Sequence, residues 1–347
     1  MHHTSVVSEI NALLLEFCQE KKLKASQYGE EYSELWETIE HHLLVGGKRL
    51  RPYCVLLAFQ AYEGKDPSRI MNVAAAWELL HVALLIYDDI IDRDEIRHGE
   101  KNISGIYSEK YISPEGKHLA LSTALLAGDV LISSAYELVQ KSTIDCMQKN
   151  KAQSFLSQAM FGVIGGELAD TVSVLLSVQE VDARAVATHK TAEYSLVYPF
   201  LTGAMLAQVD EAEYEKLRGL GSSLGLAYQL VDDLLGVFGN ETTTGKSNTS
   251  DIQEKKRTVL LQETFSRIQS DEKNWLEERM GNNAALQDDD IQRIRELMIT
   301  SGAKQKIEHE ISVLEQKAHT QLDQLTMNEF GKEHMRLLVK KLCTRKS

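Results

Sequence analysis

The chain has 347 residues, of which 43% are hydrophobic and 26% are charged, and this composition excludes a disordered or fibrous protein. Its 51 acidic residues outnumber 38 lysines and arginines, and the net charge of −13 argues against a nucleic-acid partner, whose phosphates bind basic residues. The four cysteines lie far apart and form no CxxC pair, so neither a zinc site nor a redox motif is indicated.

The amino end lacks a basic segment followed by a long apolar one, so it does not resemble a secretory signal. The most apolar segments, around residues 72–87 and 119–136, are interrupted by polar or charged side chains. They therefore fall short of a clean membrane span of about 20 apolar residues. We expect a cytoplasmic protein with no stable membrane insertion.

Apolar residues recur at helical spacing from the amino end onward, as in Ile10, Leu14 and Phe17, whereas the alternation typical of strands is scarce. Two segments, residues 72–92 and 217–236, are apolar or small on several faces, which indicates helices buried at the centre of the fold. The sequence therefore predicts an all-α protein.

Breaks between helices are expected at Gly46-Gly47, at residues 63–67, around residues 99–116 and at residues 239–250, where turn-forming residues gather. From about residue 262 onward the chain is charge-rich with apolar residues at helical spacing, as in amphipathic helices. Only 4 prolines are present and no Pro/Ser/Gly-rich linker divides the chain, so we expect one domain over residues 1–347.

The first acidic motif, Asp88-Asp89-Ile90-Ile91-Asp92, directly follows a long apolar run. Helical spacing places Asp88 and Asp92 on one face, one turn apart. Like charges at this spacing repel each other, so this face needs a compensating cation. Magnesium suits several carboxylate oxygens, because it shares its coordination with substrate phosphates and water.

A second acidic pair, Asp232-Asp233, also follows a segment that we expect to be a buried helix. If the two helices face each other, their carboxylates can hold a group of metal ions from both sides. Such a group would bind a diphosphate and stabilise the negative charge that grows on it as its carbon–oxygen bond breaks.

Basic residues gather at three places in this otherwise acidic chain: Lys48 to Arg51 after two glycines, Arg97, and Lys246 through Arg257. A Gly-Gly turn lets the backbone and cations approach an anion closely, and arginine makes bidentate contacts with phosphate. Each cluster alone is more often a solvated surface, but together with the acidic pairs they indicate phosphorylated ligands.

In this order, Gly46-Gly47-Lys48-Arg49-Leu50-Arg51-Pro52, Asp88 to Asp92 and Asp232-Asp233 resemble the signature motifs of the trans-isoprenyl diphosphate synthases, also called polyprenyl synthetases. The resemblance extends from about Leu43 to Leu260. It implies the isoprenoid synthase fold, a bundle of long, mostly antiparallel helices around a central apolar tunnel.

The resemblance also assigns roles to residues. Asp88, Asp92 and Asp232 match metal-binding carboxylates, and Asp89 a supporting one. Lys48, Arg51 and His81 match residues that bind the diphosphate of isopentenyl diphosphate, although a lone histidine in an apolar helix is usually only a core residue. The residues that match the site of the allylic diphosphate are Arg97, Lys190 with Thr191, Lys246 and Lys256. Gln229 matches a substrate-binding glutamine near the reaction centre. Among all of these, the resemblance makes Asp88, Arg97 and Lys190 the catalytic residues.

Three departures from the family pattern stand out. Gly236 occupies the place of a third aspartate in the second motif, so metal binding there should depend chiefly on Asp232. His98 follows Arg97 where a second arginine is common. It could bind diphosphate more weakly, with a pH dependence near the unperturbed pKa of histidine, about 6.5. Lys255 stands in place of a frequent glycine.

The implied reaction is a head-to-tail (1'-4) condensation of isopentenyl diphosphate with an allylic diphosphate (dimethylallyl, geranyl or farnesyl), giving an all-trans prenyl diphosphate. The resemblance implies three magnesium ions in each active site and a homodimer. The apolar walls of the bundle must exclude water, because a carbocation would otherwise be quenched.

In the family, residues that line the tunnel below the first motif set product length. Helical spacing places Ala83, Leu80 and Ala76 on one face running away from Asp88, and the small alanines favour a product of geranylgeranyl length or somewhat longer. Bulky side chains elsewhere, such as Tyr136 or Trp77, could close the tunnel.

Four alternatives remain open. One is a farnesyl diphosphate synthase, and another is a non-catalytic subunit of a heteromeric synthase, although such subunits typically lose the aspartate motifs. A terpene cyclase would share the first motif but needs a different second motif. A helical scaffold without chemistry does not explain why acidic pairs end buried helices.

Overall fold

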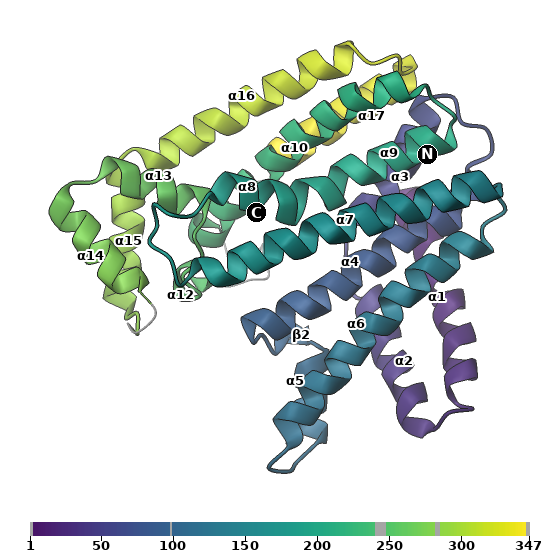
Figure 1. Cartoon of the computed structure of the whole chain (residues 1–347), viewed down its shortest axis with the longest axis horizontal. Helices are drawn as coiled ribbons and strands as arrows, with labels where there is room; N and C mark the ends of the chain where they lie inside the picture. Colours follow the sequence, from purple (N-terminus) through teal and green to yellow (C-terminus); the bar gives the residue numbers. More distant parts are fainter. Residues whose placement is uncertain (1–2, 98, 240–247, 282–284, 345–347) are drawn as a thin grey trace. The chain divides into compact units, whose positions relative to one another are not determined.

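The computed structural model describes residues 3–97, 99–239, 248–281 and 285–344. These residues fold into helices, and the only strands among them are the short antiparallel pair β1 (Ile96–Arg97) and β2 (Glu100–Lys101) (Figure 1). The all-α class is therefore confirmed. The chain forms two compact units, and the prediction of a single domain over residues 1–347 stays a prediction.

The first unit comprises residues 1–156 and 199–209. Its elements are α1 (His3–Ala25), α2 (Glu30–Leu44), α3 (Leu50–Ala61), η1 (Pro67–Ile70), α4 (Met71–Asp92), the two strands, α5 (Ile103–Lys110) and α6 (Gly116–Lys141). Helix α4 packs against α6 and α3 and is buried on most of its faces, as its apolar sequence predicted. Gly128 on α6 provides the room for the ring of Tyr87, because a Cβ there would lie 2.5 Å from that ring.

The second unit comprises residues 157–198 and 210–347. Helices α7 (Cys146–Ser173) and α9 (Tyr198–Leu206) contribute to both units, and the other elements are α8 (Ala183–Ala187), η2 (Thr188–Val197), α10 (Glu211–Phe238), α12 (Ser250–Gln253), α13 (Val259–Arg267), α14 (Ser270–Met280), α15 (Asp288–Thr300), α16 (Ala303–Asp323) and α17 (Glu329–Cys343). Helix α10 packs against η2, α16 and α17. The predicted amphipathic helices after residue 262 are present.

One predicted break was wrong in part. Residues 99–116 contain helix α5, which begins where the Asn102 side chain accepts a hydrogen bond from the backbone N–H of Gly105. The break at Gly46-Gly47 is confirmed, and both glycines have positive φ angles of 73° and 85°. Of the break at 239–250, residues 240–247 lie outside the described residues.

Two helical stretches, Pro67–Asp92 and Gly116–Lys141, are long and apolar enough to cross a membrane by length and composition, which the sequence reading did not expect. In the first stretch, 72% of the apolar window is buried inside the protein, and in the second 39%. Core helices of soluble proteins have the same properties, so this is weak evidence for a membrane span.

Candidate functional site

The acidic residues of the first motif lie at the carboxyl end of α4. The helix ends after Asp92 because Arg93 adopts a left-handed conformation, with φ 61°, and donates its backbone N–H to the carbonyl of Asp89. Asp89 is buried, whereas Asp88 and Asp92 are partly exposed. The carboxyl end of a helix carries partial negative charge, so three carboxylates there repel both one another and the helix. This end of α4 therefore favours a bound cation.

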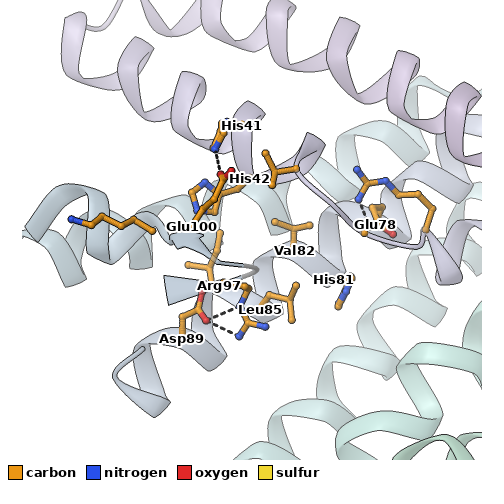
Figure 2. A pocket seen from close by; sticks show the side chains of 14 residues that line it. His41, His42, Glu78, His81, Val82, Leu85, Asp89, Arg97 and Glu100 are labelled. Atoms are coloured by element: carbon orange, nitrogen blue, oxygen red, sulfur yellow. Dashed lines mark hydrogen bonds and ion pairs between the residues drawn. The ribbon is translucent and has the colours of Figure 1, made fainter. Parts of the chain in front are cut away.

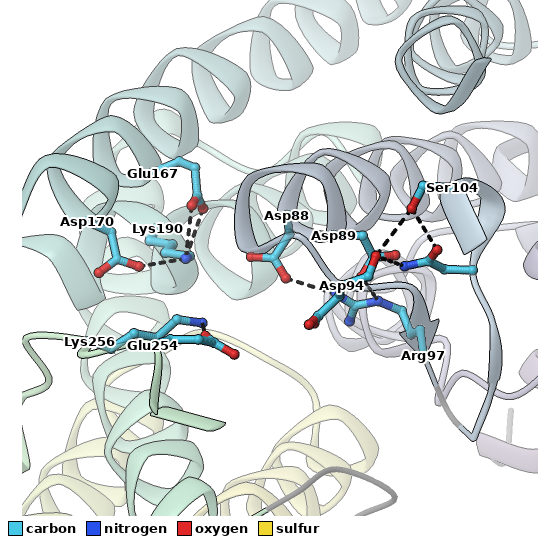
Figure 3. A network of polar contacts seen from close by, with 11 residues as sticks. Asp88, Asp89, Asp94, Arg97, Ser104, Glu167, Asp170, Lys190, Glu254 and Lys256 are labelled. Atoms are coloured by element: carbon cyan, nitrogen blue, oxygen red, sulfur yellow. Dashed lines mark hydrogen bonds and ion pairs between the residues drawn. The ribbon is translucent and has the colours of Figure 1, made fainter. Parts of the chain in front are cut away.

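Arg97 supplies one such cation from the hairpin that follows. Its Nε donates to Oδ1 of Asp89 at 2.7 Å, and its Nη2 donates to Oδ2 of Asp88 at 2.9 Å (Figure 3). The hairpin is closed at its base by Asn102, whose Nδ2 donates to the carbonyl of Asp94 at 2.6 Å. This closure turns Arg97 back towards α4.

The protonation of this cluster reflects both burial and charge. Burial raises the pKa of Asp89 to about 6, although the guanidinium of Arg97 acts in the opposite direction. Burial lowers the pKa of Arg97, but the carboxylates of Asp89 and Asp88 outweigh that effect and raise it overall. Arg97 therefore stays charged beside both carboxylates.

The glycine turn before α3 separates its basic residues into two kinds. Arg49 points into the core, where its Nη1 donates to Oε1 of Glu78 at 2.8 Å and its Nε donates to Asn11 at 2.7 Å. Both members of the Arg49–Glu78 pair are 2% exposed. Arg49 is thus structural, whereas Lys48 is exposed on the turn and Arg51 is buried at the start of α3.

A pocket in the first unit joins this turn to the acidic end of α4 (Figure 2). Its lining includes Gly47 and Arg49 from the turn, His81 from α4, and the paired Asp89 and Arg97. The pocket thus brings together His81 and Arg97 from the predicted site residues, with Asp89, which was expected to support the metal-binding carboxylates. Lys48 and Arg51 do not line this pocket.

Helix α2 forms another wall of the pocket with two histidines that the sequence reading did not select. His41 Nε2 lies 2.8 Å from Oε2 of Glu100, next to the hairpin that carries Arg97. Burial lowers the pKa of His42, whose Nδ1 bonds to the carbonyl of Thr38. The His41–Glu100 contact connects β2 of the hairpin to α2.

In the second unit, Lys190 lies on η2, a π-helix. Its ammonium group donates to Oδ2 of Asp170 at 2.7 Å and lies 3.0 Å from Oε2 of Glu167 (Figure 3). Gly166 on α7 permits this approach, because a Cβ there would lie 2.5 Å from the backbone nitrogen of Lys190. A π-helix is often found at a functional site, since its extra residue changes the direction of neighbouring side chains.

Thr191 begins a hydrogen-bonded chain from η2 to α10. Its hydroxyl donates to Oε1 of Gln229 at 2.6 Å, and Nε2 of Gln229 donates to Oδ1 of Asp233 at 2.8 Å. Burial raises the pKa of Asp233 to about 8, an effect that the hydrogen bond from Gln229 opposes. Asp232, one residue earlier, is exposed. The two acids of the second motif thus differ in environment.

The basic residues after α12 also divide by role. The guanidinium of Arg257 is buried and donates to the carbonyls of Leu176 and Met280, both at 3.1 Å. The ammonium group of Lys255 donates to the carbonyl of Gly281. Lys256 pairs with Glu254 at 2.7 Å on the partly exposed side. Two of these three cations therefore stabilise the fold.

Two predicted residues, His98 and Lys246, lie outside the described residues. Among the residues that are described, no three His, Cys, Asp or Glu side chains are arranged to hold a metal ion by themselves. The two carboxylates of Asp88 and Asp92 would leave coordination positions of a magnesium ion open to substrate phosphates and water.

The sequence reading missed the acidic partners of Lys190 and the core pair of Arg49. A signal for the first existed, because Glu167 and Asp170 follow a Gly-Gly pair at helical i, i+3 spacing on α7. For Glu78 the signal was its position within an otherwise apolar helix, where a charge needs a partner.

The amino-acid sequence is similar to those of known proteins. The family model described as polyprenyl synthetase matches residues 33–298. A geranylgeranyl diphosphate synthase of Saccharolobus solfataricus is 32% identical over 270 residues, covering 77% of each chain. A (2E,6E)-farnesyl diphosphate synthase of Mycobacterium tuberculosis is 31% identical over 264 residues, covering 74% of this chain and 68% of the other.

Among solved structures, the chain is similar to a geranylgeranyl pyrophosphate synthase from Corynebacterium glutamicum, complexed with isoprenyl diphosphate and magnesium. The TM-score is 0.92 at 27% identity, covering 99% of this chain and all of that one. The fold of this chain thus also occurs in a synthase that was solved with isoprenyl diphosphate and magnesium.

Proposed function

The chain belongs to the polyprenyl synthetase family and is a trans-prenyltransferase, and from that premise we propose that it condenses isopentenyl diphosphate with an allylic diphosphate to make an all-trans prenyl diphosphate. The observation that carries the proposal is the acidic end of α4. There, three carboxylates gather at the negative end of a core helix, and the partly buried guanidinium of Arg97 pairs with two of them.

We propose magnesium as the cofactor, with three ions in each active site. Asp88 and Asp92 on one motif and Asp232 on the other would hold them, and the chemistry of these donors fits. Magnesium binds through one or two carboxylates and completes its coordination with substrate phosphates and water. When bound, the ions supply positive charge that stabilises the departing diphosphate. The similar Corynebacterium structure contains magnesium and isoprenyl diphosphate.

The chain's own residues have separate tasks in this proposal. Arg97, Lys190 and Lys256, together with His98 and Lys246 outside the described residues, bind the allylic diphosphate. Lys190 is held by Asp170 and Glu167, so its ammonium group is already oriented before a ligand arrives.

Thr191 and Gln229 lie in one hydrogen-bonded chain, which fixes the orientation of the glutamine amide. In this proposal that amide faces the reacting carbon of the allylic substrate. Lys48, Arg51 and His81 bind the diphosphate of isopentenyl diphosphate. The carbon–oxygen bond of the allylic diphosphate breaks and leaves a carbocation. The double bond of isopentenyl diphosphate then attacks this carbocation, and the departing diphosphate accepts the proton that the new product loses.

For product length we propose geranylgeranyl diphosphate or a somewhat longer product. Ala83, Leu80 and Ala76 are all fully buried in α4, and the two alanines keep this face small. Ala83→Phe should shorten the main product, because the larger ring would block the space beyond the first motif. Product analysis by chromatography checks this, and an unchanged product would show that this face does not form the tunnel floor.

A farnesyl diphosphate synthase is the second candidate, favoured by the mycobacterial relative.

We further propose a cytoplasmic homodimer with no stable membrane insertion. Helix α6 supports the proposed dimer, because three of its leucines are exposed: Leu119, Leu125 and Leu126. Exposed apolar patches of this kind often form protein–protein interfaces.

The decisive experiment is incubation of the purified full chain with magnesium, isopentenyl diphosphate and, in turn, dimethylallyl, geranyl and farnesyl diphosphate. We expect turnover with at least one primer and a longest product of geranylgeranyl length or more. A main product of farnesyl length would support the second candidate. The absence of turnover with every primer would contradict catalysis and favour a non-catalytic subunit.

A further inference from the structure

Gly236 lies one helical turn after Asp232 on α10, and its missing side chain leaves room that another residue uses. A Cβ on Gly236 would lie 2.1 Å from Oδ2 and 2.8 Å from Cγ of Asp251. Real Cβ atoms do not approach other atoms so closely. The carboxylate of Asp251 thus occupies the volume that a side chain at position 236 would fill.

The backbone of α12 holds Asp251 at this position. Its carbonyl accepts a hydrogen bond from the backbone N–H of Lys256 at 2.9 Å, and the neighbouring Ile252 is 2% exposed. Helix α12 also packs against α10. The backbone hydrogen bond and the burial of Ile252 therefore hold Asp251 beside the second acidic motif.

The resulting arrangement repeats the spacing of the first motif. Asp88 and Asp92 are four residues apart on α4, and Asp232 and Gly236 are four residues apart on α10, so both pairs lie on one face one turn apart. With Asp251 over Gly236, a second carboxylate lies one turn along from Asp232. The neighbouring Asp233 does not supply this second carboxylate, because it is buried and accepts a hydrogen bond from Gln229.

Resting on the proposed function, we infer that Asp251 supplies the carboxylate that the second motif lacks at Gly236 and, together with Asp232, binds the hydrated divalent cation that accompanies the diphosphate. The glycine is then a requirement of the arrangement, since any side chain at position 236 would displace the carboxylate of Asp251.

The test uses the purified full chain with magnesium chloride and inorganic pyrophosphate. The midpoint of thermal unfolding is followed as magnesium is added at a fixed, high pyrophosphate concentration. Asp251→Asn, Gly236→Ala and the double variant Gly236→Asp/Asp251→Ala are compared with the wild type. Asp289→Asn, an exposed acid in the first turn of α15, is the matched control, and unfolding without ligands checks that every variant folds.

We expect Asp251→Asn and Gly236→Ala to need about tenfold more magnesium than the wild type for half of the shift in midpoint, which is the usual effect of losing a supporting carboxylate. The double variant should return to within about threefold of the wild type, because it moves the carboxylate onto α10. Asp289→Asn should behave as the wild type.

If Asp251→Asn needs no more magnesium than the wild type, this inference is wrong, while the proposed function stands. The same holds if the double variant needs as much magnesium as Asp251→Asn. A wild-type protein whose midpoint does not respond to magnesium and pyrophosphate would instead overturn the proposed function, and this inference with it.

Discussion

At the scale of single residues, the two acids of the second motif show how the same side chain acquires different properties. Asp232 is exposed on α10, whereas Asp233 is buried and accepts a hydrogen bond from Gln229. Burial raises the pKa of Asp233 to about 8, so it is mostly protonated at neutral pH and is a poor metal ligand there. Sequence alone could not separate these two neighbours.

This difference predicts unequal losses of activity. Asp88→Ala should lower kcat by about 100-fold or more, because it removes a carboxylate from the ion-binding face of α4. Asp233→Ala should cost less, about tenfold or below, since Asp233 acts on the site through Gln229 and not as a metal ligand. Steady-state assays with magnesium and the best primer measure both, and equal losses would contradict the proposed inequality.

A pH-dependent stability effect should also follow from Asp233. Its pKa in the folded protein, about 8, exceeds the value of about 3.9 in an unfolded chain, so the folded state holds this proton more tightly. The contribution of Asp233 to stability is therefore greatest at low pH and is lost progressively as the pH rises from about 4 to about 8.

Asp233→Asn cannot ionise and should lack this loss. Without magnesium, its free energy of unfolding should exceed that of the wild type at pH 8.5 by on the order of a few kcal/mol, with a smaller difference at pH 5. Denaturant unfolding at the two pH values measures this. The same difference at both pH values would mean that Asp233 does not titrate in this range.

At the scale of secondary structure, the turn between α2 and α3 depends on one buried ion pair. Arg49 and Glu78 are both 2% exposed, and removing one partner leaves a buried charge without compensation. Arg49→Ala should therefore reduce the free energy of unfolding by about 3–5 kcal/mol. Arg69→Ala, which removes an arginine from an exposed position, should change it by less than about 0.5 kcal/mol.

Denaturant unfolding of both variants measures the difference. Arg49→Ala with wild-type stability would contradict a structural role, and Arg49 would then have to be considered with Lys48 and Arg51 as a ligand-binding residue.

The helices themselves were largely predictable, because periodicity depends on neighbouring residues. The long apolar runs predicted α4 and α10, which extend over Met71–Asp92 and Glu211–Phe238. Helix α5 was missed because it has only 8 residues, including a glycine, and begins at a cap that forms together with the hairpin. Short helices of this kind depend on tertiary contacts more than on propensity.

The candidate site was predictable in its residue types and less so in its pairings. Asp88 and Asp92 follow from helical spacing alone. The hydrogen bond from Arg97 to Asp89 requires the hairpin, and the approach of Asp251 to Gly236 requires α12 to pack against α10. Contacts between distant parts of the chain carry no local signal.

At the scale of the whole molecule, the exposed apolar surface of α6 predicts how copies of the chain associate. Leu126 is 59% exposed on α6, and Leu337 on α17 is 58% exposed. Leu126→Glu should convert the proposed homodimer into monomers, because it would bury a charge at the interface. Leu337→Glu should leave the dimer intact, and light scattering of both variants gives the mass. A dimeric Leu126→Glu variant would place the interface elsewhere.

The π-helix η2 has a consequence for how this protein can change during evolution. A π-helix contains an additional residue compared with an α-helix, and each residue turns an α-helix by about 100°. Deleting one residue between Thr191 and Val197 would rotate Thr191 against Val197, so their contacts with Gln229 and Gly221 could not both persist. The length of this segment is therefore constrained, because Thr191 must reach Gln229 while Val197 packs against Gly221.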